Sequence, residues 1–340
     1  MVLSVLVGAL GVAIIVAVIV DVLWTTVAAG AAGGPITARL THVLWRSALR
    51  WHRRRRQLQV AGVTIITSVI LVWIVLLLCG WFLIFSATPD AVVSADTGQP
   101  GDIWSRMYFT GYTVFTLGLG DYVPGAPLWR VTTIPATATG LAVVTLAITF
   151  LLSVTESVTQ RRSLAAQIFA LGSSPSVILQ RAWNGARIEG LEQALQSLTS
   201  DVAELAQRHL AFPVLHYFHS VERDTAVAPS IAVLDELLTV LDHGVSAEHR
   251  LPTLTTQQLR DAITQLLHLG SAIDPAQLGH LSSPPPVPPT VELRRIGLPL
   301  VDDAQWRGHV EKLADRRQAL RDYLTVEAWG WESVWEPDRS

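Results

Sequence analysis

The chain of 340 residues contains a single cysteine, Cys79, which lies inside a long apolar run. One cysteine excludes an intrachain disulfide framework and a zinc site built from cysteines. No phosphate loop, nucleophile–base pair or metal-protease motif occurs in the second half, and a dinucleotide-binding loop is missing there too. The sequence therefore predicts that the protein is not an enzyme and that it uses no cofactor.

Charge is absent from two long apolar runs, Gln57–Pro89, which contains Cys79, and Val131–Thr155. A third run, Val2–Ala29, is interrupted only by Asp21. Each run exceeds the roughly 20 residues with which a helix spans a bilayer. The first run begins without a basic region and is too long for a cleaved signal, so we expect it to be retained. These runs predict three membrane-spanning helices.

Basic and acidic residues lie in different connecting segments. The segment Thr88–Asp102 contains three aspartates and no Lys or Arg, whereas Arg161 and Arg162 follow the last span. Arginines also fill the link after the first span: Arg39, Arg46, Arg50, Arg53, Arg54, Arg55 and Arg56. The positive-inside rule then predicts a plasma-membrane protein with its N-terminus outside and its C-terminal half in the cytoplasm.

The formal net charge is −3, so the chain as a whole indicates no nucleic-acid partner. The basic segment 36–56 is better explained as an interfacial helix that contacts anionic lipid headgroups. Leu40, Leu44 and Trp51 would supply its apolar stripe. The expected partners at this segment are membrane lipids.

A short re-entrant stretch, Thr116-Leu117-Gly118-Leu119-Gly120-Asp121, lies between the last two apolar runs. Before it, Asp102 is placed to cap a mostly apolar helix over Ile103–Phe115, with Arg106 near the outer end. Non-helical backbone at membrane depth is tolerated only where it is buried in protein or lines a watery path. Glycines at alternate positions permit positive φ and let successive carbonyls point the same way.

Residues 60–158 resemble the potassium-channel family of the two-helix, single-pore-loop type, whose filter coordinates ions with backbone carbonyls. The resemblance implies that K⁺ ions bind the carbonyls of Thr116, Leu117, Gly118 and Leu119 and the Thr116 hydroxyl. Gly120 and Asp121 would shape the outer mouth, and Gly140 would be the gating hinge of the inner helix. Four chains would surround one axis as a homotetramer, and no metal other than permeating K⁺ is expected.

The chain departs from the family pattern at several positions. Leu119 stands where the filter commonly has a tyrosine, and Phe109 stands where the hydrogen-bonding partner of that tyrosine is expected. Tyr112 replaces a glutamate that is often found behind the filter. Potassium selectivity is the prediction, with three alternatives: a weakly selective cation channel, a membrane-anchored sensor or scaffold with a vestigial pore, and a transporter.

Two residues of the spans keep more than one interpretation. Gly140 serves either as the hinge or only to pack helices, because glycine is common in membrane helices. Asp21 lies toward the cytoplasmic end of the first span. Snorkelling or pairing with Arg39 or Arg46 is favoured over a place in the ion path. The first span carries no arginine, so no voltage sensor is predicted.

The second half has helical periodicity. Apolar residues recur at steps of three and four: Ile188, Leu191, Leu195, Leu198, Val202 and Leu205. Such a seam fits either a four-stranded coiled coil or a helix of an ordinary bundle, and similar stretches at 231–241 and 259–269 favour the bundle. His209, His216 and His219 could bind a metal or sense pH, but ordinary packing or surface histidines are the preferred interpretation.

The predicted fold class is an all-α membrane protein: a potassium-channel pore domain with an extra N-terminal transmembrane helix and a helical cytoplasmic C-terminal domain. The expected segments are an N-terminal helix (1–29), a basic interfacial segment (36–56), a pore domain (57–158), a helical domain (159–281), a stiff proline-rich linker (282–290) and a C-terminal helical segment (291–340).

Overall fold

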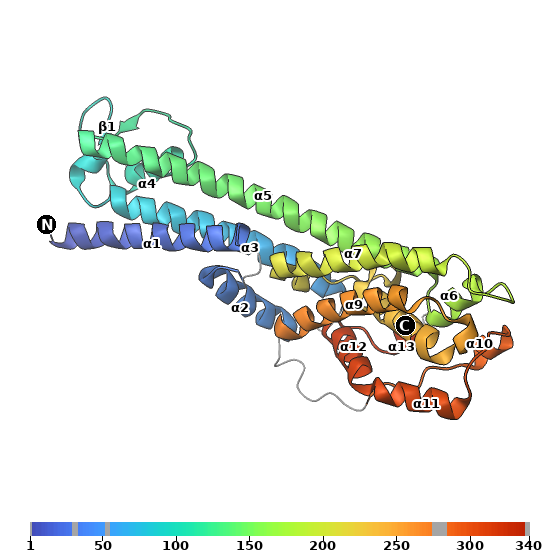
Figure 1. Cartoon of the computed structure of the whole chain (residues 1–340). Coiled ribbons are helices and arrows are strands. Elements are labelled where there is room, and N and C mark those ends of the chain that lie inside the picture. Colours follow the sequence, from blue (N-terminus) through green and yellow to red (C-terminus); the bar gives the residue numbers. More distant parts are fainter. Residues whose placement is uncertain (1, 29–32, 52–54, 274–283, 337–340) are drawn as a thin grey trace. The chain divides into compact units, whose positions relative to one another are not determined.

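A computed structural model describes residues 2–28, 33–51, 55–273 and 284–336. The chain divides into two compact units (Figure 1). The first contains Met1–Trp51 and Val63–Val154, and the second contains His52–Gly62 and Thr155–Ser340. Arg53 and Arg54 of the basic run, and the first two residues of the proline-rich stretch, lie outside the described residues.

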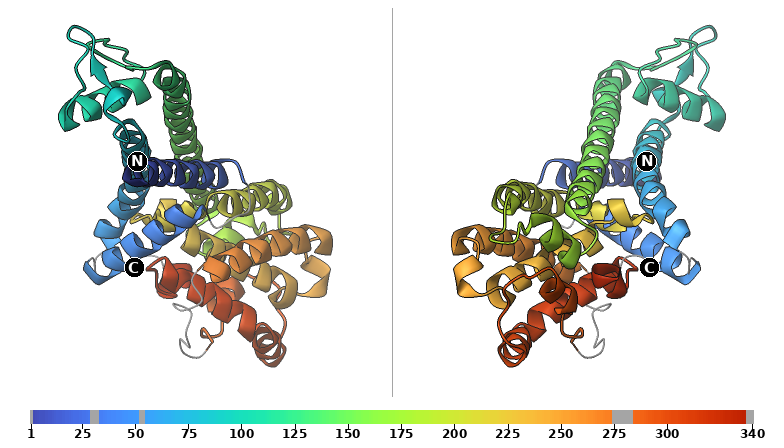
Figure 2. Two further views of the ribbon diagram at one scale, coloured as in Figure 1. Left: turned by 90° about the vertical axis from the view of Figure 1, so that its left-hand side faces the viewer. Right: turned by 90° about the vertical axis from the view of Figure 1, so that its right-hand side faces the viewer.

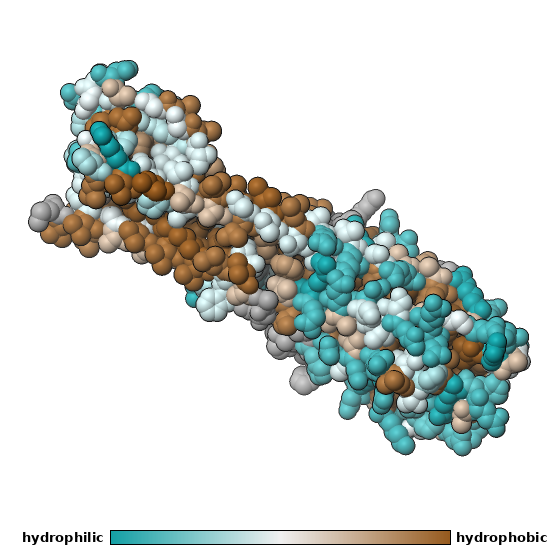
Figure 3. Space-filling view, turned by 45° about the horizontal axis from the view of Figure 1, so that its top comes forward, coloured by the Kyte–Doolittle hydropathy of each residue, from teal (hydrophilic) through white to brown (hydrophobic). Residues whose placement is uncertain are grey.

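Three of the described helices are long and apolar enough to cross a membrane, which confirms an all-α membrane protein. They are α1 (Val2–Thr26), α3 (Arg55–Phe85, apolar from Val60) and α5 (Pro127–Leu171). The face drawn in Figure 3 is brown over these helices and mostly teal over the second unit. Many large apolar side chains stay exposed on the spans, as lipid contact requires.

The first helix packs closely against α3 through two glycines. A Cβ built on Gly11 would come within 2.5 Å of the Gly80 carbonyl oxygen. A Cβ built on Gly80 would meet the side chain of Ile15 at 2.6 Å. Small residues let membrane helices approach until their backbones touch, and this contact replaces the hydrophobic driving force that lipid removes. The extra N-terminal helix is therefore part of the membrane unit.

Asp21 is completely buried and is neither snorkelled nor paired with Arg39 or Arg46. Its carboxylate caps the start of α2 (Pro35–Trp51), where it accepts hydrogen bonds from the backbone N–H groups of Ile36 (2.6 Å) and Thr37 (3.2 Å). Snorkelling or pairing with an arginine, the favoured interpretation of Asp21, was wrong. The free N–H groups at the start of a helix can stabilise a buried carboxylate as well as an arginine would.

Two short paired strands lie in the segments that connect the helices of this unit. One precedes the pore helix α4 (Ile103–Val114), and the other precedes the last span. The chain runs through a 3₁₀ turn, η1 (Pro89–Ala91), and strand β1 (Val93–Ser94) before α4 begins. Strand β2 (Tyr122–Val123) follows the re-entrant stretch and pairs antiparallel with β1, with Val93 opposite Val123. This pairing closes the loop that carries the re-entrant stretch.

The second unit is a helical bundle around a wholly buried helix, α8, in which every residue from Val227 to Thr239 is buried. The last turns of α5 contribute Leu164 and Ile168 to the same apolar core. The surrounding elements are α6 (Pro175–Ala182), α7 (Leu191–Ala211), η2 (Pro213–Tyr217), η3 (Arg223–Thr225), η4 (Val240–Gly244), η5 (Ala247–His249), α9 (Thr253–Ile273), α10 (Val291–Arg295), α11 (Asp303–Lys312), α12 (Ala314–Val326) and α13 (Glu332–Trp335).

The apolar seam of α7 packs inside this bundle. Leu195, Val202 and Leu205 are fully buried in the core, and α7 and α9 lie side by side (Figure 2). The seam is therefore covered by helices of its own chain, as the bundle interpretation predicted, and it is not available for a coiled coil between chains.

The proline-rich stretch 282–290, which the sequence predicted to be a stiff linker, does not isolate the C-terminal segment that follows it. The carbonyls of Pro285 and Pro286 accept hydrogen bonds from the Arg317 guanidinium at 3.1 and 2.7 Å. The carbonyl of Pro288 accepts from the Trp306 indole at 3.2 Å. Proline carbonyls remain strong acceptors, so a stiff stretch can dock as readily as it can separate. The segment after it belongs to the same core.

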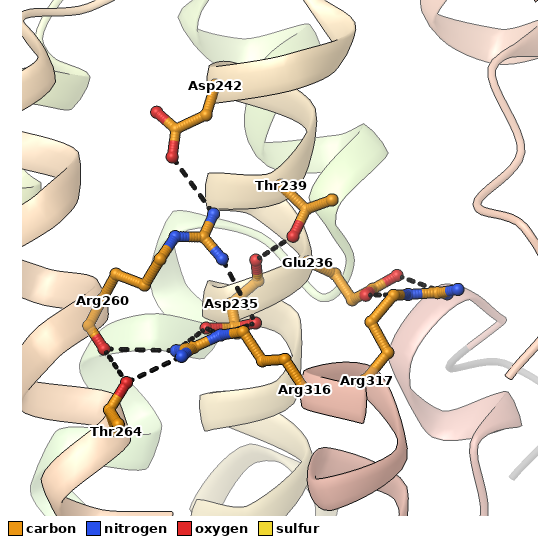
Figure 4. A network of polar contacts seen from close by, with 8 residues as sticks. All are labelled: Asp235, Glu236, Thr239, Asp242, Arg260, Thr264, Arg316 and Arg317. Atoms are coloured by element: carbon orange, nitrogen blue, oxygen red, sulfur yellow. Dashed lines mark hydrogen bonds and ion pairs between the residues drawn. The ribbon is translucent and has the colours of Figure 1, made fainter. Parts of the chain in front are cut away.

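Two carboxylates on buried α8 are matched by arginines of α12 (Figure 4). Arg316 donates to both oxygens of Asp235, and Arg317 donates to both oxygens of Glu236 at 2.7 and 3.0 Å. Removing one partner of such a buried pair leaves an uncompensated charge and costs about 3–5 kcal/mol. These pairs fix how α12 docks on α8.

We expect Leu195→Ala to lower the free energy of unfolding of the second unit by about 2–5 kcal/mol, because it opens a cavity in a fully buried site. The number of subunits should not change. Leu210→Ala, on an exposed position of the same helix, is the control and should have little effect. Denaturation and light scattering in detergent measure both quantities. Dissociation of the oligomer by Leu195→Ala alone would contradict the bundle assignment.

Candidate ion-conduction site

The pore helix α4 begins where the sequence predicted. Asp102 Oδ1 accepts hydrogen bonds from the backbone N–H of Ser105 at 2.8 Å and from its hydroxyl at 2.6 Å. A carboxylate at this position satisfies donors that the first helical turn leaves free. The predicted cap is therefore confirmed.

Arg106 joins the pore helix to the end of α3. Its guanidinium donates to the carbonyl of Phe85 at 3.1 Å and to that of Thr88 at 2.8 Å. It also reaches the carbonyls of Pro89 at 3.2 Å and Gly101 at 2.9 Å. The last carbonyls of a helix lack partners within the helix, and the rigid fork of an arginine can serve several at once. The only charge of α4 thus holds the outer ends of two helices together.

The inner end of the pore helix closes with a hydrogen-bonded turn. The N–H of Leu117 donates to the carbonyl of Tyr112 at 2.8 Å, and the N–H of Thr116 donates to that of Thr113 at 3.2 Å. This pair of bonds defines a Schellman ending, in which the residue at Thr116 takes a left-handed conformation. Thr116 has φ of 61°, although glycine is the usual residue there.

Positive φ then recurs at every second residue of the re-entrant stretch. Gly118 has φ of 59° and Gly120 has φ of 86°, following 61° at Thr116. The two glycine positions have the conformation that the sequence predicted for them. The sequence did not predict it for Thr116, because a β-branched residue adopts positive φ only at an energetic cost. Local strain of this kind is concentrated at functional sites.

The outer end of the stretch is tied to its surroundings. The Tyr112 hydroxyl donates a hydrogen bond to the Tyr122 carbonyl, just after Asp121. The Asp121 carbonyl accepts from the N–H of Ala95 at 2.9 Å, beside the β1–β2 pair. Tyr112 therefore connects the pore helix to the strand that follows the re-entrant stretch, from the position where the resemblance implied a glutamate.

Phe109 is not available as an apolar partner for Leu119. Its ring is 2% exposed and lies edge-on to Phe85, with ring centroids 5.0 Å apart, and near Tyr112 at 5.3 Å. Leu119 itself is 58% exposed. Rings of the same chain therefore enclose Phe109, which stands where the sequence predicted the partner of position 119.

The inner helix α5 crosses the end of the pore helix at Gly140. A Cβ at Gly140 would collide with the Val114 carbonyl oxygen, so the backbones touch here. Nearby, the Thr137 hydroxyl donates to the Thr113 carbonyl at 3.2 Å. Packing thus explains the glycine directly, and its role as a gating hinge stays a prediction. The same crossing holds the ending of α4 that positions Thr116.

A family model described as "Ion channel" matches residues 62–157, which contain the pore helix, the re-entrant stretch and most of the two flanking spans. Over 322 residues the chain is 31% identical to the uncharacterized membrane protein YdjJ of Bacillus subtilis (strain 168), and the match covers 94% of each chain. The chain belongs to the same family as YdjJ. No solved structure matches it. It is a membrane protein with an ion channel domain.

A buried ion pair lies just beyond this channel domain, on the continuation of α5. The guanidinium of Arg161 donates to Glu327 at 2.5 Å and to the carbonyls of Leu215 and Phe218 at 2.8 and 2.9 Å. Nδ1 of His219 lies 3.1 Å from the other oxygen of Glu327. We call this cluster of Arg161, His219 and Glu327 the node. Sequence reasoning missed it, because Arg161 and Glu327 are 166 positions apart.

Burial alone would raise the pKa of the Glu327 carboxyl, but Arg161 and, to a smaller extent, His219 hold it far below its usual range. The carboxyl is therefore ionised at neutral pH, and the charges of the node compensate one another. Because the partners belong to α5 and to the end of α12, the node clamps the extension of the inner helix within the second unit.

The three histidines singled out in the sequence are all buried near this node. Nδ1 of His209 lies 3.0 Å from the Leu205 carbonyl, and the rings of His216 and His219 are 6.3 Å apart between centroids. Among the described residues, no group of three His, Cys, Asp or Glu is placed to hold a metal ion. The structure therefore favours the packing interpretation over the metal site.

We expect the second unit to lose stability as the pH falls from about 6.5, because burial, reinforced by Arg161, lowers the pKa of His209 to about 4. The unfolded chain then binds more protons than the folded one, so stability falls with pH across that window. The loss should be about 2 kcal/mol between pH 6.5 and 5.

His209→Gln should remove this dependence on pH, whereas His268→Gln, at an exposed site of the same unit, should keep it. Chemical denaturation in detergent, followed by tryptophan fluorescence, gives the free energies of unfolding. An unchanged pH slope in His209→Gln would show that His209 is not the titrating group.

Proposed function

We propose that the chain is the subunit of a potassium-selective channel that conducts passively across the plasma membrane as a homotetramer. The proposal rests on one observation: a pore helix ends in a Schellman turn at Thr116 and is followed by positive φ at Gly118 and Gly120, between two membrane spans. Thr116, Leu117, Gly118 and Leu119 would supply oxygens to dehydrated K⁺, while Gly120 and Asp121 would form the outer mouth.

Four chains are required because one re-entrant stretch cannot enclose an axis. In a single chain the side chains of Leu117 and Leu119 are 65% and 58% exposed, and neighbouring copies around an axis would cover them. Around a four-fold axis the stretches would form stacked rings of carbonyl oxygens. The carboxyl ends of four pore helices would direct their negative poles at the ion path.

Conduction by this route involves no covalent chemistry, so the proposed protein is a channel and not an enzyme, and its only ligand in the pore is permeating K⁺. Carbonyl oxygens replace the water shell of the ion, and ions in adjacent sites displace one another. A weakly selective cation channel is the second candidate. Leu119 favours it, because leucine has no hydroxyl with which to brace the filter.

We expect Gly118→Ala and Gly120→Ala each to abolish potassium flux. A Cβ at either position meets no neighbour within 4 Å in the single chain, so the cost comes from the backbone conformation itself. That cost is about 1–2 kcal/mol in each of four chains, and φ of 86° at Gly120 is the more demanding. Potassium efflux from liposomes containing the purified protein measures the effect.

Gly98→Ala is the matched control, because Gly98 also has positive φ, at 66°, and open space around it, but lies in the outer loop. It should conduct like the wild type. Normal flux in both filter variants, with tetramers intact, would refute the channel assignment. Wild-type protein that conducts neither K⁺ nor Na⁺ would instead favour the sensor or scaffold with a vestigial pore.

The proposed orientation places the N-terminus outside and the second unit in the cytoplasm. In a Cys79→Ala background, Asp96→Cys should be labelled on intact cells by a thiol reagent that cannot cross the membrane, whereas Arg55→Cys should not. Labelling after permeabilisation shows that Arg55→Cys is reactive. The reverse pattern on intact cells would invert the assigned topology.

A further inference from the structure

The second unit contains a cavity of about 350 Å³ between helices α9 and α12. Sites for small molecules are concave and mostly apolar, and their volumes begin at about 300 Å³. The gap beside the node is much smaller, at about 10 Å³, and has room for no more than one water molecule. The cavity between α9 and α12 is therefore large enough to hold an organic ligand.

Helix α12 presents one face to this cavity. Asp315, Ala319, Asp322 and Val326 line it, and they follow one another at steps of four, three and four residues. Such spacing keeps side chains on one side of a helix. Two carboxylates, about two turns apart, therefore face the cavity on either side of a small alanine.

The other walls of the cavity are largely apolar. Leu267 of α9 and Val326 of α12 supply aliphatic side chains, and Tyr323 supplies an aromatic one. Thr264 and His268 share the face of α9 with Leu267, because residues three and four apart lie on one side of a helix. Apolar walls of this kind favour a ligand with a hydrocarbon body, whose transfer out of water is favourable.

The positive charge at the cavity is already neutralised. Arg316 also lines it, but its guanidinium donates to both oxygens of Asp235 and, at 2.7 Å, to the Thr264 hydroxyl (Figure 4). Arg260 pairs with Asp242 at 3.1 Å and lies 3.8 Å from Asp235. Two arginines thus balance two aspartates in this network, which offers little attraction to an anion.

The two carboxylates on α12 are not neutralised in this way. Within the part of the chain that the structure describes, neither Asp315 nor Asp322 takes part in an ion pair. Asp322 is half-buried and accepts a hydrogen bond from the Gln318 side chain at 2.8 Å, whereas Asp315 is exposed. A carboxylate has about four acceptor sites, so both keep capacity for a further donor. The cavity therefore attracts a cation.

Tyr323 adds a buried polar atom to the lining residues. Its side chain is 9% exposed, and its hydroxyl has no hydrogen-bond partner among the residues that the structure describes. Buried hydroxyls are normally paired, because an unpaired one has lost its hydration without compensation. A hydroxyl oxygen can accept from an ammonium group, and an aromatic ring attracts organic cations. Tyr323 is thus compatible with a cation, and the two aspartates select the sign of the charge.

We propose that the cavity between α9 and α12 binds an amphipathic organic cation, with a primary ammonium group on an apolar body. Asp322, the more buried of the two aspartates, accepts hydrogen bonds from the ammonium group, and Asp315 adds its negative charge. The apolar body packs against Leu267 and Val326. The inference concerns the second unit alone and does not depend on the proposed channel function.

The probe for this site is 4-phenylbutylammonium. Equilibrium dialysis of the labelled compound against purified full-length protein in detergent measures its binding, with empty micelles as the blank. The neutral 4-phenylbutanol should bind about fivefold more weakly, the difference expected for one partly exposed ion pair. The anion 4-phenylbutyrate should show no saturable binding. Binding of the butyrate as tight as that of the ammonium compound would overturn the assignment to a cation.

Asp315→Asn/Asp322→Asn keeps the size of both side chains and removes their charge. It should weaken binding of the ammonium probe about fivefold and leave binding of the alcohol unchanged. Glu248→Gln/Glu292→Gln makes the same change of charge at exposed sites of the second unit and should bind like the wild type. Unchanged affinity for the ammonium probe in Asp315→Asn/Asp322→Asn would show that these carboxylates do not recognise it.

Ala319→Trp tests the cavity itself. Ala319 is exposed, so a larger side chain there can enter the cavity without displacing the core. The variant should unfold at the same temperature as the wild type and bind none of the three compounds. Ala304→Trp adds the same ring at an exposed position of α11 and should bind normally. Undiminished binding in Ala319→Trp would refute the location of the site.

Discussion

The structure depends on one constraint: a chain that re-enters the membrane without continuing as a helix must satisfy its backbone polar groups from nearby protein. The Schellman turn at Thr116 closes the inner end of α4, and Arg106 serves carbonyls at the outer end. Tyr112 and the β1–β2 pair hold the strand that follows the re-entrant stretch. None of these supports uses the carbonyl oxygens of residues 116–119.

The inner helix carries this constraint into the rest of the chain. Helix α5 is continuous from Pro127 to Leu171, so the helix that touches the pore helix at Gly140 also supplies Leu164 and Ile168 to the core of the second unit. Arg161, on the same helix, is clamped by Glu327.

Buried carboxylates recur in both units, and each has a matched set of donors. Asp21 is held by helix N–H groups, a hydroxyl and an indole, whereas Asp235, Glu236 and Glu327 are held by arginines. A buried charge is tolerated only when such partners offset its desolvation. These junctions therefore specify which helices meet in each unit.

Much of this architecture is local in origin and could be predicted from the sequence. The apolar runs, the Asp102 cap, the alternate glycines and the seam of α7 are properties of neighbouring residues, so they identified the spans, the pore helix, the positive φ of the filter and a bundle helix. Positive φ at Thr116 escaped prediction, because it results from the whole helix ending and not from the residue's own preference.

Only the tertiary structure decided the partners of charged and aromatic side chains. Asp21 found the start of α2 and Trp73, which is 52 positions away, and Phe109 was enclosed by rings of its own chain. The proline-rich stretch docked on Arg317, and Arg161 met Glu327. Spacing and hydropathy report how a residue relates to its neighbours in sequence. Which of several possible donors reaches a carboxylate is settled by the packing of helices that lie far apart in the chain.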